Sequence, residues 1–107
     1  MNKNRIIWSE FASGQLDDIF EYYKNRVSLT ISLKIVQSIL IDIEKLENNP
    51  FIGQSEELLK SRKLEYRSLI SKNYKIIYTI DDSNQLIKIY DVFDTRQNPK
   101  KIIKYKE

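Results

Sequence analysis

Apolar residues in the first half of the chain recur with the period of two amphipathic helices. A short β-like run occupies residues 5–8, and after Ser9 apolar residues return every three or four positions, which places them on one helical face. The same spacing resumes after Ser28 and stops at residues 48–50, Asn-Asn-Pro, because the residue before a proline is pushed out of helical geometry. The two sets are Ala12, Leu16, Ile19, Phe20, Tyr23 and Val27 in the first helix, and Leu29, Leu33, Val36, Leu40, Ile43 and Leu46 in the second.

Each predicted helix has a polar residue suited to capping its first turn. Ser9 can accept a hydrogen bond from an unpaired backbone N–H, and Ser28 or Thr30 can do the same for the second helix. Gly14 costs about 1 kcal/mol relative to alanine inside a helix, so the first helix begins either at Ser9 or near Ser13. The short connection between the helices predicts an antiparallel hairpin. Stripes of this width are typical of a core, and the alternative is a surface for a partner.

The apolar period changes to two in the second half of the chain, as in β-strands. Three runs, at residues 64–70, 74–80 and 86–93, are separated by turn-like breaks. Residues 51–62 are predicted to be a loop with a helical turn at 56–60. We therefore predict an α+β domain of order β-α-α-β-β-β, with an N-terminal helical hairpin packed on a mostly antiparallel four-stranded sheet.

Composition excludes several classes of function. The 107 residues suit a single domain, which we expect to span residues 1–107. The absence of cysteine excludes a disulfide scaffold and a thiol nucleophile, and the absence of histidine removes the usual general base and the commonest metal ligand. No glycine-rich phosphate loop or metal-ligating cluster occurs, so we expect no cofactor and no metal. Neither a membrane-spanning run nor a signal-peptide pattern is present, so we expect a cytoplasmic protein without membrane attachment.

The net charge of +3 hides an uneven distribution along the chain. Residues 9–59 carry four Lys or Arg against nine Asp or Glu, whereas residues 60–80 carry six against one. Residues 81–95 are acidic again, and a basic tail begins at about residue 97. If the fold brings the two basic segments together, they form a patch suited to phosphate groups or an acidic partner. The alternative is that these lysines only solvate exposed strands and the tail.

An ordered set of short motifs extends over residues 5–103. No single motif is specific, but the set in this order resembles the RelE/ParE superfamily of toxins from bacterial type II toxin–antitoxin systems. The resemblance implies the fold predicted above, growth inhibition as the activity, and a small antitoxin that wraps the toxin. The motifs are Trp8-Ser9 with the first helical stripe, Asn49-Pro50-x-x-Gly53, Glu65-Tyr66-Arg67-Ser68-Leu69, Asn73-Tyr74-Lys75-Ile76-Ile77-Tyr78, and Val92-Phe93-Asp94-Thr95-Arg96-Gln97-Asn98-Pro99.

The superfamily divides by target, and the resemblance leaves alternatives. ParE-like members inhibit DNA gyrase, a type II topoisomerase, without catalysis of their own. RelE-like members are endoribonucleases that cleave messenger RNA on the ribosome with a cluster of Lys and Arg residues and a Tyr near the C-terminus. The loop at residues 49–53 and the ending at 95–99 look more like the ParE branch, so we favour gyrase. A member with lost toxicity or another target is the third alternative.

The resemblance assigns candidate residues position by position. In the ribonuclease alternative, cations stabilise the charged phosphorane of RNA cleavage, and a lysine or a tyrosine serves as the base. That set is Arg67, Lys75, Arg96 and Tyr105. The predicted target-binding patch is Lys63, Arg67, Arg96, Lys100 and Lys101.

Two of these arginines also have a structural interpretation. Arg67 can pair with Glu65 or with an acidic residue of a helix, and Arg96 can pair with Asp94 or Asp91. Because Arg96 follows the last predicted strand and precedes the basic tail, we expect it at a functional loop in the most positive part of the surface.

The antitoxin expected from the resemblance is small and net acidic. Its C-terminal segment is expected to fold on the toxin, with a helix over the helical hairpin and an extended part that adds to the sheet or follows its basic residues. The complex would be a toxin–antitoxin hetero-oligomer. The residues predicted to bind the antitoxin are Leu16, Phe20, Tyr23 and Leu33.

Overall fold

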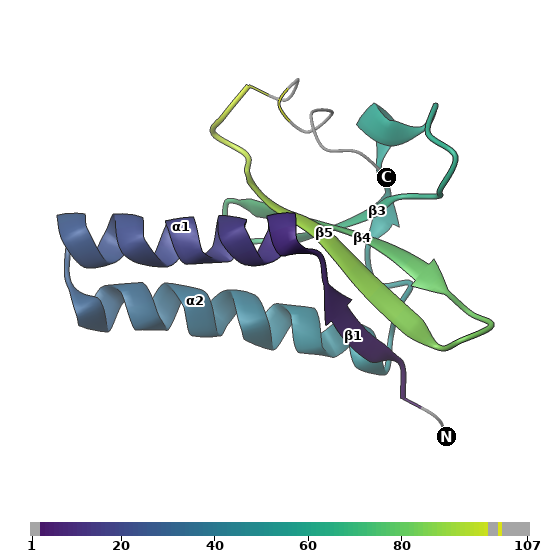
Figure 1. The fold of residues 1–107 in the computed structure, drawn as a ribbon, viewed down its shortest axis with the longest axis horizontal. Helices are drawn as coiled ribbons and strands as arrows, with labels where there is room; N and C mark the ends of the chain where they lie inside the picture. Colours follow the sequence, from purple (N-terminus) through teal and green to yellow (C-terminus); the bar gives the residue numbers. More distant parts are fainter. Residues whose placement is uncertain (1–2, 99–100, 102–107) are drawn as a thin grey trace.

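Two antiparallel helices lie against one face of a twisted sheet (Figure 1). The structure is a computed structural model that describes residues 3–98 and residue 101. The predicted α+β class and the order β-α-α-β-β-β of the main elements are confirmed. In chain order the elements are β1 (Arg5–Trp8), α1 (Glu10–Arg26), α2 (Leu29–Glu44), the 3₁₀ turn η1 (Lys45–Glu47), β2 (Gln54–Ser55), the 3₁₀ turn η2 (Glu57–Leu59), β3 (Arg67–Ser71), β4 (Tyr74–Asp81) and β5 (Leu86–Asp94).

Serine caps determine where both helices begin. The Ser9 Oγ accepts a hydrogen bond from the Ala12 N–H at 3.0 Å, and the Ser28 Oγ accepts one from the Ile31 N–H at 3.1 Å. Of the two predicted starts of α1, the one at Ser9 is therefore correct. Gly14 lies inside the helix, where an added Cβ would meet no atom within 4 Å.

The sheet has five strands in the order β1-β5-β4-β3-β2 and not the predicted four. β1 runs parallel to β5, and the other pairs are antiparallel. The additional strand β2 comes from the predicted loop and pairs only Gln54 and Ser55 with β3. Gly53 permits this approach, because a Cβ there would lie 2.4 Å from the Ser68 carbonyl oxygen and 2.6 Å from the Tyr78 hydroxyl. Two paired residues are too few to produce a detectable alternation, so periodicity could not reveal this strand.

The sheet is covered by different elements on its two faces. The face under the helical hairpin carries the larger apolar cluster, with Ile76, Tyr78, Ile87, Ile89 and Val92 from the sheet and Ala12, Ile39 and Ile43 from the helices. Ile77 points the other way, because neighbouring residues of a strand alternate between faces. It belongs to a second cluster that includes η2 and the residues after it: Leu59, Tyr66, Ile77, Tyr90 and Phe93.

A β-bulge changes the alternation in β5. Tyr78 of β4 pairs with Ile89, whereas the preceding Ile77 pairs with Asp91, so Tyr90 is an extra residue on β5. Beyond the bulge Asp94 pairs with Tyr74 of β4. Directly paired residues share a face of the sheet. The odd-numbered Ile87 and Ile89 therefore face the hairpin before the bulge, and the even-numbered Val92 and Asp94 lie on that same face after it.

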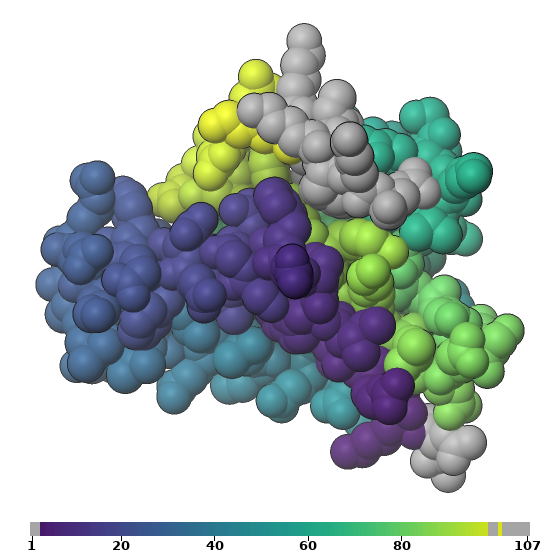
Figure 2. All heavy atoms as spheres, viewed as in Figure 1, coloured from purple at the N-terminus to yellow at the C-terminus, as the bar shows by residue number. Residues whose placement is uncertain are grey.

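Part of the predicted helical core is exposed. Val27, Leu29 and Leu33 are 60%, 52% and 44% exposed, because the outer end of the hairpin extends beyond the sheet (Figures 1 and 2). At that end the helices contact each other through Ser32, whose hydroxyl donates to the Phe20 carbonyl. The prediction that Leu29 and Leu33 belong to the core is therefore wrong, although Ile43 and Leu46 of the same stripe are buried.

Candidate functional site

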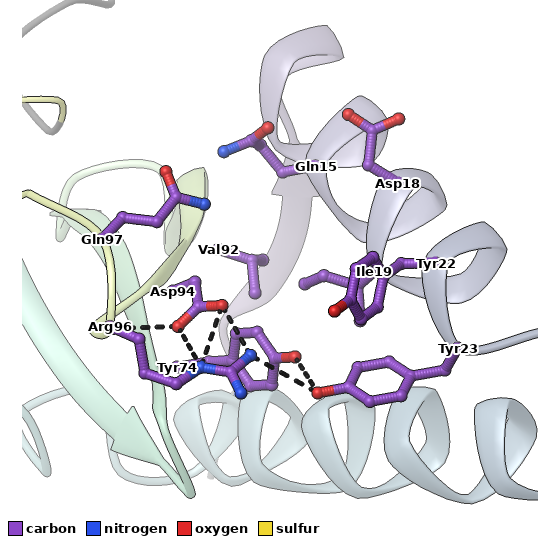
Figure 3. A pocket seen from close by; sticks show the side chains of 10 residues that line it. All are labelled: Gln15, Asp18, Ile19, Tyr22, Tyr23, Tyr74, Val92, Asp94, Arg96 and Gln97. Carbon is purple, nitrogen blue, oxygen red and sulfur yellow. Dashed lines mark hydrogen bonds and ion pairs between the residues drawn. The ribbon is translucent and has the colours of Figure 1, made fainter. Parts of the chain in front are cut away.

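A cleft of about 410 Å³ lies between α1 and the chain that leaves β5 (Figure 3). The helix contributes one wall, and the ends of β4 and β5 contribute the other. Its lining combines tyrosine rings, two amides, two carboxylates and one guanidinium. The lining residues are Gln15, Asp18, Ile19, Tyr22, Tyr23, Tyr74, Val92, Asp94, Arg96 and Gln97.

Arg96 is held in this cleft by Asp94. Its Nη2 donates to Asp94 Oδ2 at 2.7 Å, its Nε donates to Oδ1 at 3.0 Å, and its backbone N–H donates to Oδ1 at 2.9 Å. The hydrogen bonds from Arg96 keep the pKa of Asp94 below its ordinary value, and Asp94 in turn raises the pKa of Arg96. The predicted pairing of Arg96 with Asp94 is confirmed.

The turn after β5 is anchored to the turn between β3 and β4. The Thr95 N–H and the Thr95 Oγ1 both donate to the Asn73 carbonyl, at 2.9 Å and 2.7 Å. The Asn73 side chain also donates to Asp94 Oδ1 at 3.4 Å. The carboxylate that holds Arg96 is thus itself held by the sheet.

Two tyrosine hydroxyls extend the network from Arg96 to the helix (Figure 3). The Tyr23 oxygen accepts long hydrogen bonds from the Tyr74 hydroxyl at 3.5 Å and from Arg96 Nη2 at 3.4 Å. These donors stabilise the phenolate, Tyr74 first and Arg96 second, so the pKa of Tyr23 is lowered. Burial and donation to Tyr23 raise the pKa of Tyr74. Tyr23 and Arg96, 73 residues apart in sequence, therefore belong to one hydrogen-bonded unit.

The described part of the cleft is not strongly basic. Asp18 and Asp94 contribute two carboxylates and Arg96 the only cation of the described lining residues. The basic residues Lys60 and Lys63 line a different hollow beside Tyr66. The fold places this basic segment away from Arg96. That Arg96 lies in the most positive part of the surface stays a prediction, because it depends on the basic tail. Lys100 lies outside the described residues, and Lys101 is exposed.

Arg67 has a structural position under the loop before β2. Its side chain is 15% exposed, and its Nη2 donates to the carbonyls of Gly53 and, at 3.4 Å, of Phe51. The guanidinium lies 5.2 Å from the Phe51 ring centre. Its Nη1 is 3.6 Å from Glu65, which confirms the predicted ion pair. The guanidinium thus holds the loop against β3.

Lys75 is also engaged inside the protein. Its Nζ is 2.8 Å from Oε1 of Glu56, whose side chain is 3% exposed. Burial opposes ionisation of Glu56, but Lys75 and the Leu58 N–H, which donates to Oε2 at 3.0 Å, outweigh it and lower the pKa of Glu56. Tyr74 lines the cleft with Arg96, so the adjacent Lys75 lies on the opposite face of the sheet.

The residues proposed for RNA cleavage are therefore not brought together. Arg96 lies beside Tyr74 at one end of β4, and Arg67 donates to Gly53 beside Tyr78, farther along the same strand. Lys75 pairs with Glu56 on the opposite face of the sheet. Lys63 is exposed in the loop between η2 and β3. Tyr105 lies outside the described residues.

The predicted antitoxin-binding residues do not all face outward. Leu16 packs against the core under the hairpin, and Phe20 is half-buried with the Lys24 ammonium 5.8 Å from its ring centre. Tyr23 lines the cleft, and Leu33 is exposed on α2. Several exposed apolar residues gather toward the outer end of the hairpin. They are Tyr22, Val27, Leu29, Ile31 and Leu33.

Asp91 is a buried ionisable residue that pattern analysis did not single out as a site residue. It is 1% exposed on β5, beside the bulge, and its Oδ1 accepts a hydrogen bond from Gln15 Nε2 at 3.1 Å. Burial outweighs this bond and raises the pKa of Asp91 to about 6. In the sequence, the only sign of a buried carboxylate is an aspartate within the apolar run of residues 86–93. The bulge beside Asp91 cannot be recognised from that pattern.

Solved structures share this architecture and define the class. A chain of the chromosomal ParDE toxin–antitoxin system from P. aeruginosa is 18% identical, with a TM-score of 0.70 over 85% of this chain and 95% of that one. A chain of the toxin–antitoxin complex RelBE2 from Mycobacterium tuberculosis is 17% identical, with a TM-score of 0.59 over 86% and 98%. The YoeB/ParE toxin from Agrobacterium tumefaciens is 21% identical, with a TM-score of 0.55 over 84% and 96%. The fold is that of the RelE/ParE toxins.

The chain belongs to the family described as ParE toxin of the type II toxin–antitoxin system parDE, whose model matches residues 6–99. It is thus a type II toxin of the RelE/ParE superfamily, and the resemblance found in the sequence is confirmed. No curated protein matches the chain. Within residues 3–98 and at residue 101, no helix is long and apolar enough to span a membrane, and no group of three or more acidic residues is arranged to hold a metal ion.

Proposed function

We propose that this chain is a cytoplasmic toxin that inhibits DNA gyrase by binding it, as ParE-like members do, without catalysis of its own. The observation that supports this most is the separation of its cations. Lys75 pairs with Glu56 on the face of the sheet away from the hairpin. Arg67 pairs with Tyr78 in the sheet and donates to the Gly53 carbonyl, whereas Arg96 lies in the cleft beside Tyr74, at the other end of β4. RNA cleavage without histidine needs several cations around one phosphate, whereas binding to a protein has no such requirement.

A supercoiling assay tests this proposal. Purified chain is added to purified gyrase, ATP and relaxed plasmid, and the expected result is inhibition that increases with the concentration of the chain. In cells, induction should arrest growth and reduce supercoiling while messenger RNA stays intact. The 5′ ends of cellular transcripts provide the comparison. New cleavage sites within translated messages, with normal supercoiling, would instead support the RelE-like ribonuclease. Normal growth, supercoiling and messages would support loss of toxicity or another target.

We further propose a small net-acidic antitoxin as the partner, bound in a hetero-oligomer. Two solved structures of the same fold come from toxin–antitoxin systems, ParDE and RelBE2. The exposed apolar residues toward the outer end of the hairpin, with Val27 at 60% exposure, would be buried by a partner helix.

Co-expression with the neighbouring small open reading frame tests this partner. The expected product is a stable complex whose mass, measured by light scattering, exceeds that of the 12.8 kDa chain. Growth of cells that carry both genes should be normal. A chain that is purified alone as a monodisperse protein, and that the neighbouring product neither binds nor neutralises, would contradict the proposal.

A further inference from the structure

We infer that the cleft between α1 and the end of β5 is a receptor for a glutamate side chain of a protein partner, bound by Arg96 and Tyr23. The inference deepens the proposed function and rests on it for the nature of the partner. It is carried by the hydrogen-bond donors that the described network leaves unused.

Arg96 keeps one edge of its guanidinium for a ligand. Asp94 occupies Nε and Nη2, and the same Nη2 reaches the Tyr23 oxygen. Among the described residues Nη1 has no acceptor, and an arginine carries two N–H groups there. Because Asp94 and the turn behind it fix the side chain, little conformational freedom remains to be lost when a ligand binds.

Tyr23 supplies a second donor beside the first. Its oxygen accepts from Tyr74 and from Arg96, so its own O–H proton points to neither of them. No acceptor for that proton occurs in the described part of the chain. Two donors thus lie at the same end of the cleft (Figure 3), and the two oxygens of a carboxylate match them.

The remaining wall of the cleft favours glutamate over a phosphodiester. Ile19 and Val92 line it with apolar surface for two methylene groups. Arg96 is already paired with Asp94, and Asp18 adds another carboxylate at the lining, so the described lining residues offer no second cation to the successive phosphates of a nucleic-acid backbone. The carboxylate of Asp18 repels any anionic ligand in the cleft. Removing its charge should therefore tighten the binding of an anion and weaken the binding of a cation.

The test is a titration of the isotopically labelled full chain with capped glutamate, N-acetyl-glutamate N-methylamide, followed by ¹H–¹⁵N NMR. We expect saturable shifts confined to the Arg96 Nε–H and to amides around the cleft, with a millimolar dissociation constant. Capped glutamine should bind about fivefold more weakly, because charge-assisted hydrogen bonds are stronger than neutral ones. Dimethyl phosphate, the probe for a nucleic-acid backbone, should bind more weakly than capped glutamate.

Two matched pairs of variants make the test specific. Tyr23→Phe removes the second donor and should weaken binding of capped glutamate about fivefold. Tyr22→Phe removes a hydroxyl from the neighbouring ring, which has no bond to Arg96, and should change binding less than twofold. Asp18→Asn should tighten binding about twofold, whereas Asp17→Asn, one residue earlier and outside the cleft, should have a smaller effect. Thermal melting of each variant verifies that it is folded.

Three results would overturn the inference: equal binding of capped glutamate and glutamine, tighter binding of dimethyl phosphate, or an unchanged Tyr23→Phe variant. The titration uses no growth assay, gyrase or antitoxin. If the chain binds capped glutamate as described but does not inhibit gyrase, the inference about the cleft stands and the proposed function is wrong.

Discussion

At the scale of single residues, Arg67 and Arg96 differ mainly in what surrounds them. The Arg67 side chain is 15% exposed beneath a loop, and its Nη2 donates to two backbone carbonyls. The Arg96 side chain is 60% exposed beyond the last strand, and its partner is one carboxylate. Arg67 therefore stabilises the fold, whereas Arg96 is available to a partner.

Arg96→Ala should abolish growth inhibition while leaving the fold intact. The ion pair with Asp94 is exposed, and such pairs contribute about 0–1 kcal/mol. In a domain of this size we expect the melting temperature to fall by no more than about 4 °C. Growth after induction and thermal melting of the same variant are the two measurements. Full toxicity with unchanged melting would remove Arg96 from the site, and a large fall in melting temperature would make it structural.

Arg67→Ala should lower the free energy of unfolding by about 2 kcal/mol. The substitution leaves the Gly53 and Phe51 carbonyls without their donor and removes the contact with the Phe51 ring. Urea denaturation measures the change. Lys60→Ala is the control, because its ion pair with Glu57 is exposed on both sides. Equal stability of the two variants would contradict the structural role of Arg67.

Asp91 should make the stability of the protein depend on pH. Its folded pKa of about 6 lies above the ordinary value of 3.8, so the folded chain binds the proton more tightly than the unfolded chain. The resulting stabilisation is complete below about pH 4 and is lost as the pH rises through 6. Asp91→Asn should match the parent near pH 4 and exceed it by up to about 3 kcal/mol at pH 7.

Denaturation at several pH values measures this difference. Asp17→Asn, an exposed position on α1, serves as the control and should parallel the parent at every pH. A parent and an Asp91→Asn variant with parallel profiles would show that Asp91 ionises in the folded protein as freely as in the unfolded chain.

At the scale of elements, periodicity predicted the helices because each has an apolar stripe, and the three long strands because their apolar residues form runs bounded by turn-like breaks. The periodicity of a helix does not show how far the sheet beneath that helix extends. Leu29 and Leu33 have the spacing of core residues but lie where the sheet no longer covers α2. The strand β2 was missed for another reason, since its pairing depends on a close backbone approach at Gly53.

The two glycines provide a prediction at this scale. Gly53→Ala should destabilise the protein by about 2 kcal/mol or more, because the added methyl meets the Ser68 carbonyl and the Tyr78 hydroxyl. Gly14→Ala should stabilise it by up to about 1 kcal/mol, because α1 has open space there and alanine is the better helix residue. Denaturant midpoints of both variants test the pair. A stable Gly53→Ala variant would mean that β2 can move away from β3 at little cost.

At the scale of the whole molecule, the candidate site could be predicted only in part. The position of Arg96 after the last strand and its nearness to Asp94 are local properties of the sequence. Its contact with Tyr23 joins residues 73 positions apart, and local patterns contain no information about such a contact. For the same reason the sequence could not reveal that Lys75 and Arg96 lie on opposite faces of the sheet.

The bulge at Tyr90 affects how this chain is to be aligned with its relatives. In a relative whose last strand is regular, one residue fewer separates the core residue equivalent to Ile89 from the residue equivalent to Asp94, although both would lie on the same faces as here. An alignment without a gap at this point would match Phe93, and not Asp94, with the residue that lines the cleft in the relative. The roles of Asp94 and Arg96 would then be assigned to residues one position away from the true equivalents. Residues compared across relatives after Tyr90 should therefore be matched by the face of the sheet they occupy and not by counting from the start of the strand.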